Sequence, residues 1–251
     1  MDLGLDGRTV IVTGASGGLG RHIARGFAAE GADVVLTYHR LRADAELLAK
    51  EIGDRALVVP FAMDDAAAAG ALVESALDWT GRIDVLVNNA VHWGGTAPTP
   101  DRPFEAVPDA DWLRVLRANT EGALRLGRAV APTMRERRWG RMVHISSTVA
   151  VDGMAGAEYY AAAKAALHGF SRSAAFGLGR DGDILSNVVM PGLTRTDTNT
   201  AITDEEGHPY GALAPVGRLL DAAEVAGAVV YLGSAANTGI TGQVIRVSGG
   251  A

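Results

Sequence analysis

Cysteine is absent from the 251-residue sequence. Disulfides, thiolate metal sites and cysteine nucleophiles are therefore excluded, and a chain without cysteine fits a reducing compartment. No apolar run reaches the roughly 18 residues that a membrane-spanning helix needs. Residues 1–8 also lack the basic and then apolar layout of a signal peptide. We therefore expect a cytoplasmic protein with no membrane partner.

Positive charge is not in excess either. The chain has 23 Lys and Arg residues against 29 Asp and Glu residues, which gives a formal net charge of -6 and a pI near 5.5. Nucleic-acid binding depends on clustered cations that neutralise phosphates, so we exclude nucleic acid as a partner. The chain is 48% hydrophobic and 21% charged. This composition and the length suit one globular domain over residues 1–251.

Short apolar runs recur along the chain and are separated by longer segments of helical character. They cover residues 9–13, 33–37, 56–61, 83–87, 141–146, 185–190 and 244–247. Such runs are typical of buried parallel strands joined by crossover helices. The pattern predicts a Rossmann-type, doubly wound α/β sheet with helices on both faces. Ligands bind such sheets at the carboxyl ends of the strands.

One stretch departs from this alternation. Residues 192–215 contain Gly, Pro, Thr and Asp with weak periodicity. We interpret the stretch as a substrate loop, because loops of this length are uncommon unless they bind something. A mobile surface loop is the alternative.

The first predicted strand runs into a glycine-rich turn, and a helical segment from about residue 19 to residue 30 follows it. Glycines let the backbone approach a pyrophosphate, and the start of the helix offers free N–H groups and partial positive charge. The turn predicts a dinucleotide site made by Gly14, Ser16, Gly17, Gly18, Leu19 and Gly20. A strand-to-helix turn without a ligand is the alternative.

The end of the second predicted strand bears on the choice of cofactor. A carboxylate at this point binds the adenosine ribose hydroxyls and repels a 2′-phosphate. Here the strand leads instead into Tyr38, His39 and Arg40, with Arg42 close by. These cations favour NADPH, and NADH is the open alternative. The same residues would otherwise be solvated at the start of a helix.

Tyr160 and Lys164 lie four residues apart in a predicted helix that ends near residue 178. This spacing places the phenol and the ammonium on one helix face, where the cation would lower the tyrosine pKa toward the working pH. Tyr160 could then exchange a proton with a carbonyl or alcohol oxygen while a nicotinamide carries the hydride. Most Tyr-x-x-x-Lys patterns are structural, so context decides. The neighbouring Tyr159 has Ala163 at the same spacing and lacks a cation.

Further motifs accompany these two in one order along the chain. They are Asn88-Asn89-Ala90, Asn119, Ser147, Pro191-Gly192 followed by Thr196, Thr241-Gly242-Gln243 and Gly249-Gly250. Together they resemble the short-chain dehydrogenase/reductase family over the entire chain, and most of all its 3-oxoacyl-carrier-protein reductase-type ketoreductases. The resemblance implies NAD(P)H-dependent interconversion of a ketone and a secondary alcohol. A 3-oxoacyl thioester or a polyketide-like ketone would be one such substrate.

The resemblance also implies residue roles. Ser147 would donate a hydrogen bond to the substrate oxygen, Tyr160 would be the general acid/base, and Lys164 would hold the nicotinamide ribose. Asn119 would keep a water in a proton relay to Lys164. Ser146 is the alternative to Ser147, but alternation along a strand points it to the other face. The implied cofactor contacts beyond the glycine-rich turn are Tyr38, His39, Arg40, Met63, Asn89, Ala90, Tyr160, Lys164, Pro191, Gly192, Thr194 and Thr196.

The chain departs from the family pattern after the fourth strand. Val91 stands where the family has Gly, and His92 and Trp93 follow it. We place these two residues in the substrate pocket with Ser147 and Tyr160, and packed loop residues are the alternative. No metal site is predicted.

Two departures concern the adenosine end. Ala62 stands where the family has Asp or Asn against the adenine, which leaves that contact to the Met63 backbone or to Asp64. Gly17 stands where many NADP-preferring relatives carry a basic residue. The choice of NADPH over NADH therefore stays open.

A basic cluster surrounds the fifth predicted strand and consists of Arg135, Arg137, Arg138 and Arg141. It could receive an acidic carrier protein, so the substrate is either a small molecule or a carrier-bound ketone. A solvated helix end is the alternative. Residues 111–137 and 160–178 are rich in Ala, Gly and Leu, which permits close helix packing between subunits, and the resemblance implies a homotetramer or a homodimer.

Two other functions fit parts of the sequence. A catalytically silent dinucleotide-sensing or interaction protein would need the glycine-rich turn but not a proton donor, so the full set of Asn119, Ser147, Tyr160 and Lys164 argues against it. A sugar-nucleotide epimerase usually has a longer C-terminal substrate domain than the roughly 55 residues that follow Thr196.

Overall fold

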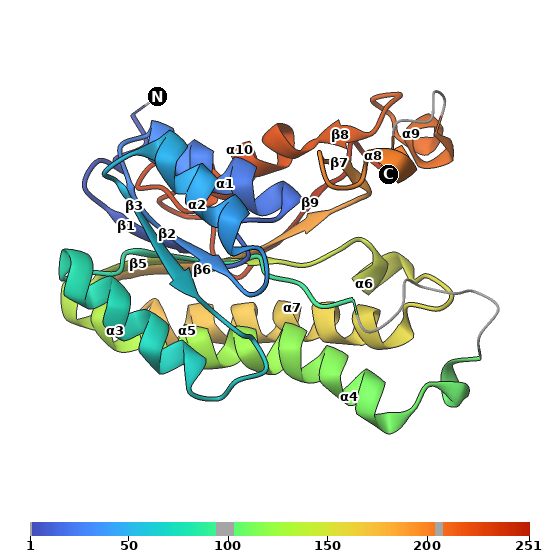
Figure 1. The fold of residues 1–251 in the computed structure, drawn as a ribbon, viewed down its shortest axis with the longest axis horizontal. Helices are drawn as coiled ribbons and strands as arrows, with labels where there is room; N and C mark the ends of the chain where they lie inside the picture. The colour runs from blue at the N-terminus through green and yellow to red at the C-terminus, as the bar shows by residue number, and fades with distance from the viewer. Residues whose placement is uncertain (1, 94–102, 204–207) are drawn as a thin grey trace.

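A seven-stranded parallel sheet forms the centre of the protein (Figure 1). The computed structural model describes residues 2–93, 103–203 and 208–251. In spatial order the strands are β3 (Ala56–Pro60), β2 (Asp33–Tyr38), β1 (Thr9–Val12), β4 (Val85–Asn88), β5 (Trp139–Ile145), β6 (Asp183–Pro191) and β9 (Val244–Val247). The strand order reverses between β1 and β4, so the carboxyl ends of these two strands are where a ligand is expected.

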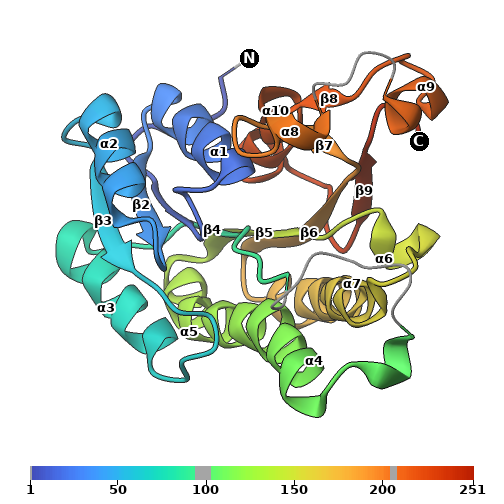
Figure 2. The ribbon, with the colours of Figure 1, turned by 45° about the vertical axis from the view of Figure 1, so that its right-hand side comes forward.

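Helices cover both faces of this sheet (Figures 1 and 2). One layer contains α1 (Gly18–Ala29), α2 (Arg42–Ile52) and α10 (Ala222–Leu232). The other contains α3 (Ala68–Thr80), α4 (Asp109–Leu116), α5 (Gly122–Arg137) and α7 (Glu158–Leu178). The predicted fold class is therefore confirmed. Within the described residues, no helix is long and apolar enough to span a bilayer.

Side chains alternate along the strands and so supply both cores. Val10 and Val12 pack with Phe27 of α1 and Val229 of α10, whereas Ile11 packs into the second core beneath α3 and α5. All of these side chains are fully buried. Strands that are apolar on both faces need helices on both faces, and this is why the runs are nearly continuous in the sequence.

The stretch between β6 and α10 contains short elements that the weak periodicity did not predict. They are β7 (Thr194–Arg195), α8 (Thr200–Thr203), α9 (Pro209–Leu213) and β8 (Leu220–Asp221), and β7 pairs with β8 as a separate two-stranded sheet. Figure 2 shows α8 and α9 beyond the carboxyl end of β6. Three further short elements are η1 (Phe104–Ala106), α6 (Val149–Asp152) and a π-helical turn, η2 (Arg117–Glu121), which joins α4 to α5.

Candidate active site

The glycine-rich turn connects β1 to α1 with almost no room for side chains. Gly14 has φ +64°, a conformation that favours glycine. A Cβ on Gly20 would collide with the carbonyl oxygen of Gly14 and would lie 2.8 Å from the Asn89 amide nitrogen. Gly17 precedes α1 without a side-chain cap, and the first turn of α1 carries no acidic residue. The N–H groups of Gly14, Ala15 and Gly17 are bonded within the protein, so the N–H groups that begin α1 are the ones that can bind an anion.

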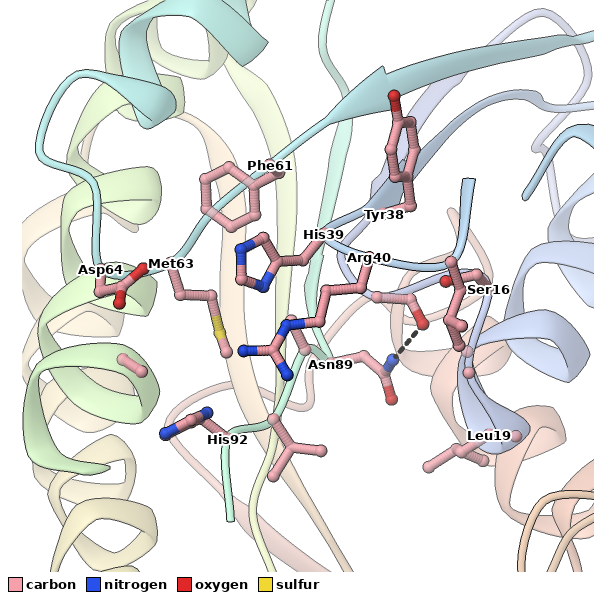
Figure 3. Close-up of a pocket in the computed structure, with 18 of the residues that line it drawn as sticks. Ser16, Leu19, Tyr38, His39, Arg40, Phe61, Met63, Asp64, Asn89 and His92 are labelled. Carbon is pink, nitrogen blue, oxygen red and sulfur yellow. Dashed lines mark hydrogen bonds between the residues drawn. The ribbon is translucent and has the colours of Figure 1, made fainter. Parts of the chain in front are cut away.

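A cavity of about 480 Å³ opens beside this turn (Figure 3). Its walls come from the carboxyl ends of β1, β2, β3 and β4, together with α1 and α4. The predicted cofactor residues that line it are Gly14, Ser16, Gly17, Gly18, Leu19, Gly20, Tyr38, His39, Arg40, Met63, Asn89 and Ala90. An open helix start, a glycine-rich cradle and a cavity of this size beside it fit a dinucleotide.

At the far end of the cavity, His39 and Arg40 follow β2 and point inward (Figure 3). Among the described residues, Arg40 makes no hydrogen bond or ion pair. Arg42 differs, because its guanidinium is 2.7 Å from Glu46 on the exposed surface of α2. Arg40 is thus the cation of this end that is available to a ligand.

The wall opposite these cations includes Met63 and Asp64, whereas Ala62 does not line the cavity. Asp64 forms an ion pair with Arg114 of α4 at 3.6 Å. The sequence predicts that the Met63 backbone or Asp64 takes the place of the family's Asp or Asn against the adenine. Both residues line the cavity.

A hydrogen-bond network fixes the end of β4 against the turn. The hydroxyl of Thr13 accepts the backbone N–H groups of Asn89 and Ala90, each at 2.9 Å. The Asn89 side chain in turn donates to the carbonyl of Thr13 at 2.8 Å. The floor of the cavity is therefore held by contacts between β1 and β4.

Tyr160, Ser147 and Lys164 meet where β5 ends. The Tyr160 hydroxyl interacts with the Ser147 side chain, and Lys164 lies one turn further along α7 with its nitrogen 5.8 Å from the centre of the Tyr160 ring. The Lys164 ammonium donates to the Ile145 carbonyl at 2.9 Å. Tyr160 and Lys164 are 7% and 2% exposed, so both work in a nearly dry site.

The pKa of Tyr160 differs in direction from our expectation. Burial raises the pKa of the phenol to about 12, and the hydrogen bond with Ser147 only partly opposes this effect. The expected lowering by Lys164 is not found, because Lys164 is itself buried and burial lowers the pKa of its ammonium to about 8. Desolvation thus outweighs the charge that the sequence spacing brings near.

Ser146 and Tyr159, the alternatives to Ser147 and Tyr160, make other contacts. The hydroxyl of Ser146 lies 2.7 Å from His168 Nε2 and 3.2 Å from the Lys164 carbonyl oxygen. The prediction that it faces away from Ser147 is wrong, because β5 ends at Ile145 and both serines then reach α7. Tyr159 donates to the Phe104 carbonyl at 3.1 Å. Ser147 is therefore the serine that contacts the catalytic candidate.

Asn119 lies in the π-helical turn η2 and is buried. Its side-chain amide contacts backbone atoms of residues 92 and 115. A cavity of about 10 Å³ separates Asn119 from Lys164, and Thr13 and Asn88 add polar groups to its wall. This volume and this polarity suit roughly one water molecule.

The side chains of His92 and Trp93 have different surroundings. His92 lines the large cavity, and burial, followed by the charge of Arg114, lowers its imidazole pKa. Trp93 instead stacks on the Tyr160 ring with 4.2 Å between the ring centres. Of these two residues, Trp93 is the one that lies beside the Tyr160 phenol.

The segment after β6 reaches back to the glycine-rich turn. A Cβ on Gly18 would lie 2.6 Å from the Thr196 Cβ, and Arg21 of α1 forms an ion pair with Asp197. Thr194 donates to the Gly192 carbonyl at 3.0 Å, and the Pro191 carbonyl accepts the backbone N–H of Thr148 at 2.9 Å. The predicted Pro191–Thr196 turn thus extends from Thr148, the residue after Ser147, to the glycine-rich turn.

One of the four arginines of the basic cluster around β5 is unavailable to a partner. Arg141 is 0% exposed, and its guanidinium donates to the carbonyls of Ser234 and Asn237 at 3.1 and 2.9 Å. Arg135 forms an ion pair with Asp181 at 2.6 Å. These residues flank the amino end of β5, whereas Ser147 follows its carboxyl end. Arg135, Arg137 and Arg138 are exposed, so the suggestion that this cluster receives a carrier protein loses Arg141 and stays a prediction for the other three.

Sequence reasoning missed several wall residues of the large cavity. They are Leu41, Phe61, Arg114 and Ala118. Phe61 directly follows β3, so the rule that ligands bind at carboxyl ends of parallel strands could have identified it. Arg114 and Ala118 come from the α4–η2 helix, and no local sequence signal marks them.

Comparisons with known proteins agree with this geometry. The family described as Enoyl-(Acyl carrier protein) reductase matches residues 14–251. Nodulation protein G of Rhizobium sp. (strain N33) is 39% identical over 250 residues, which span 98% of this chain and 97% of that protein. The 3-oxoacyl-[acyl-carrier-protein] reductase FabG of Escherichia coli (strain K12) is 36% identical over 248 residues, 99% of this chain and 98% of that one.

A solved structure extends the likeness to three dimensions. A crystal structure provisionally assigned as a betaketoacyl-ACP reductase superposes with a TM-score of 0.85 at 33% identity and covers 98% of each chain. Sequence, fold and site geometry agree over nearly the full length. The chain belongs to the short-chain dehydrogenase/reductase family of oxidoreductases.

Proposed function

We propose that this protein reduces a ketone to a secondary alcohol with a nicotinamide cofactor, or catalyses the reverse reaction, with Tyr160 as the general acid/base. One observation carries the proposal. The Tyr160 phenol and the Ser147 hydroxyl interact at the carboxyl end of β5, with Lys164 one turn along α7. Two adjacent hydroxyl donors suit one carbonyl oxygen that gains negative charge as it is reduced.

The large cavity would hold the cofactor. The start of α1 and the glycine-rich turn suit its pyrophosphate, and the Pro191–Thr196 turn and Lys164 would bind its nicotinamide half. The bound cofactor supplies the hydride. The protein supplies the proton through Tyr160, and Ser147 orients the substrate oxygen.

The small cavity between Asn119 and Lys164 supports a proton relay. Its polar walls suit a water that would accept a hydrogen bond from the Lys164 ammonium. A proton could then reach Tyr160 from the interior side while substrate covers its hydroxyl. In this role Lys164 moves protons, which accords with the lowering of its pKa to about 8 by burial.

NADPH is the cofactor that the adenosine end favours. The 2′-phosphate would meet Arg40, whose guanidinium points into the cavity, with His39 beside it (Figure 3). A charge-assisted hydrogen bond to arginine is among the strongest ways to bind a phosphate. Gly17 adds no cation, so the preference over NADH rests on Arg40 and His39.

The substrate side carries apolar groups. Val151 of α6, Ile202 of α8 and Leu213 of α9 are 62%, 61% and 76% exposed on elements that extend beyond the carboxyl ends of β5 and β6 (Figure 2). Residues 192–215 would serve as the substrate loop. Such surfaces favour a ketone with an apolar or acyl substituent, free or bound to a carrier. A cytoplasmic location remains a prediction from the sequence.

A homodimer or homotetramer is proposed from the open edge of the sheet. β9 is the last strand in the sheet order, and Gly242 just before it lies against Ala175 of α7. The next residue of α7, Phe176, is 75% exposed. A strand edge beside an exposed aromatic side chain suits pairing with a second copy. Light scattering after gel filtration would test the oligomeric state.

A substrate panel tests the proposed function. Purified protein would be assayed with NADPH and with NADH against small ketones, a 3-oxoacyl thioester, an enoyl thioester and the corresponding alcohols, by absorbance of the reduced nicotinamide. We expect turnover of at least one ketone and none of the enoyl thioester. Cofactor binding without turnover of any substrate in a broad panel would favour the dinucleotide-sensing alternative.

A further inference from the structure

The indole of Trp93 covers one face of the Tyr160 ring. The ring centres are 4.2 Å apart and the planes are inclined by 20°. Trp93 is 49% exposed, whereas Tyr160 is 7% exposed. The tryptophan therefore stands between the phenol ring and solvent.

The backbone before Trp93 is fixed at two points. The Thr13 hydroxyl accepts the N–H groups of Asn89 and Ala90. Three residues later, the Asn119 side chain accepts the N–H of His92 at 2.9 Å and donates to its carbonyl at 2.6 Å. The indole thus follows a short segment anchored to both β1 and η2, so its place over the phenol is set by the fold.

The other surroundings of Tyr160 are mostly apolar. Val115 of α4 and Ala163 of α7 pack against it, with Val149 of α6 at the edge of the same cluster. The polar or charged neighbours are Ser147 after β5 and Lys164 on α7, and Tyr159 is the other titratable side chain in this cluster. Of the aromatic rings that stack among the described residues, the indole of Trp93 is the one that covers the phenol ring.

We propose that Trp93 is a positioning residue that keeps water away from the Tyr160 ring and so holds the phenol in its neutral, proton-donating form. The inference rests on the proposed role of Tyr160 as the general acid/base. Reduction consumes the proton of a neutral phenol, whereas alcohol oxidation needs a phenolate that can accept one. Because the indole covers the face of the phenol ring, substrate would contact Tyr160 at its hydroxyl group, next to Ser147.

The physical basis is desolvation of the charged form. Burial is the main reason that the pKa of Tyr160 rises to about 12. An indole in face-to-face contact excludes water from the ring that would share the phenolate charge. Removal of the indole should therefore lower the phenol pKa and make the phenolate more accessible at neutral pH.

The test compares Trp93→Ala with Trp93→Phe, which keeps an aromatic ring over the phenol. Initial rates of ketone reduction and alcohol oxidation would be measured against pH at saturating cofactor. In Trp93→Ala, both the alkaline limb of reduction and the acidic limb of oxidation should move to lower pH by about one unit. The two limbs should move together, because the equilibrium of the reaction is fixed, whereas Trp93→Phe should keep the wild-type limbs.

A titration without substrate gives an independent readout. The phenolate absorbance of Trp93→Ala, minus that of Trp93→Ala/Tyr160→Phe, should show one tyrosine that ionises at lower pH than the same difference between wild type and Tyr160→Phe. Trp93→Leu, which fills more of the volume, replaces Trp93→Ala if the latter melts at a much lower temperature. Unchanged limbs and an unchanged titration in a folded, cofactor-binding variant would overturn the inference. The proposed function would fail separately, through an active Tyr160→Phe enzyme.

Discussion

The side chain of Asn119 brackets the backbone of His92: its oxygen accepts the His92 N–H at 2.9 Å and its nitrogen donates to the His92 carbonyl at 2.6 Å. The same nitrogen donates to the Val115 carbonyl at 2.9 Å. All hydrogen-bonding groups of this amide are thus engaged in tying η2 to the segment after β4. The proposed relay would therefore run by way of the adjacent cavity, while the amide itself ties the two segments together.

Asn119→Ala should destabilise the protein by about 2–3 kcal/mol, because it leaves the N–H and carbonyl groups of His92 without their side-chain partner. Urea unfolding followed by circular dichroism measures this change. Turnover should fall as well, since Trp93 follows the released segment. An unfolding free energy within 0.5 kcal/mol of wild type, roughly the range of surface substitutions, would contradict the bracketing role.

Gly20→Ala should weaken cofactor binding more than tenfold. The added methyl group would collide with the carbonyl oxygen of Gly14 and displace the turn that faces the pyrophosphate. Gly70→Ala is the matched control, since a Cβ there meets nothing within 4 Å inside α3. The control should bind cofactor normally and gain about 0.5–1 kcal/mol of stability. Isothermal titration with NADPH and thermal melting give the two readouts, and normal affinity in Gly20→Ala would refute the assignment of the turn.

Arg40→Ala should raise the KM for NADPH about tenfold while leaving the KM for NADH nearly unchanged, because it removes the cation aimed at the 2′-phosphate. Arg42→Ala should alter neither value, since Arg42 is engaged with Glu46 on the surface of α2. Initial rates with both cofactors decide the matter. A wild-type enzyme that prefers NADH would sink the assignment of NADPH.

Acid should destabilise the protein partly through His144. This imidazole is fully buried against Phe170, and burial, assisted by the charge of Lys164, lowers its pKa to about 4. Between pH 6.5 and 4 the unfolded chain binds a proton that the folded chain refuses. His144 therefore contributes stability above pH 6.5 that is lost as the pH falls to 4, up to roughly 3 kcal/mol.

His144→Leu should lose less stability than wild type over the same pH interval. Urea unfolding at pH 7 and pH 4.5 gives the free energies to compare. Equal losses in the two proteins would show that His144 titrates alike in the folded and unfolded chains.

The predictability of the fold follows from burial on both faces of the sheet. The seven predicted apolar runs coincide with the seven strands of the main sheet to within a few residues, and the run predicted at 244–247 matches β9 in full. Such strands can be predicted without knowing which strands they pair with, because any strand between two helical layers must be apolar. The two-residue strands β7 and β8 have no such signal, since they are held by a pairing of residues far apart in sequence.

The site was predictable where backbone geometry demands a residue type. The predicted glycines of the turn, together with Ser16 and Leu19, all line the cavity. The direction of the Tyr160 pKa was not predictable, because helix spacing reveals that Lys164 is near but not that Trp93 excludes water from the ring. Arg141 shows the same limit, since an arginine in a basic run gives no sign that its guanidinium is buried among carbonyls.

The role of Tyr160 is the centre of this account, and Tyr160→Phe tests it with the loss of a single oxygen. The substitution keeps the ring that stacks on Trp93, so the fold and the cofactor affinity measured by titration should be retained. We predict that kcat for ketone reduction falls by about 10²–10⁴-fold, the usual contribution of a general acid. A Tyr160→Phe enzyme that binds cofactor and reduces the ketone at a near wild-type rate would contradict the account.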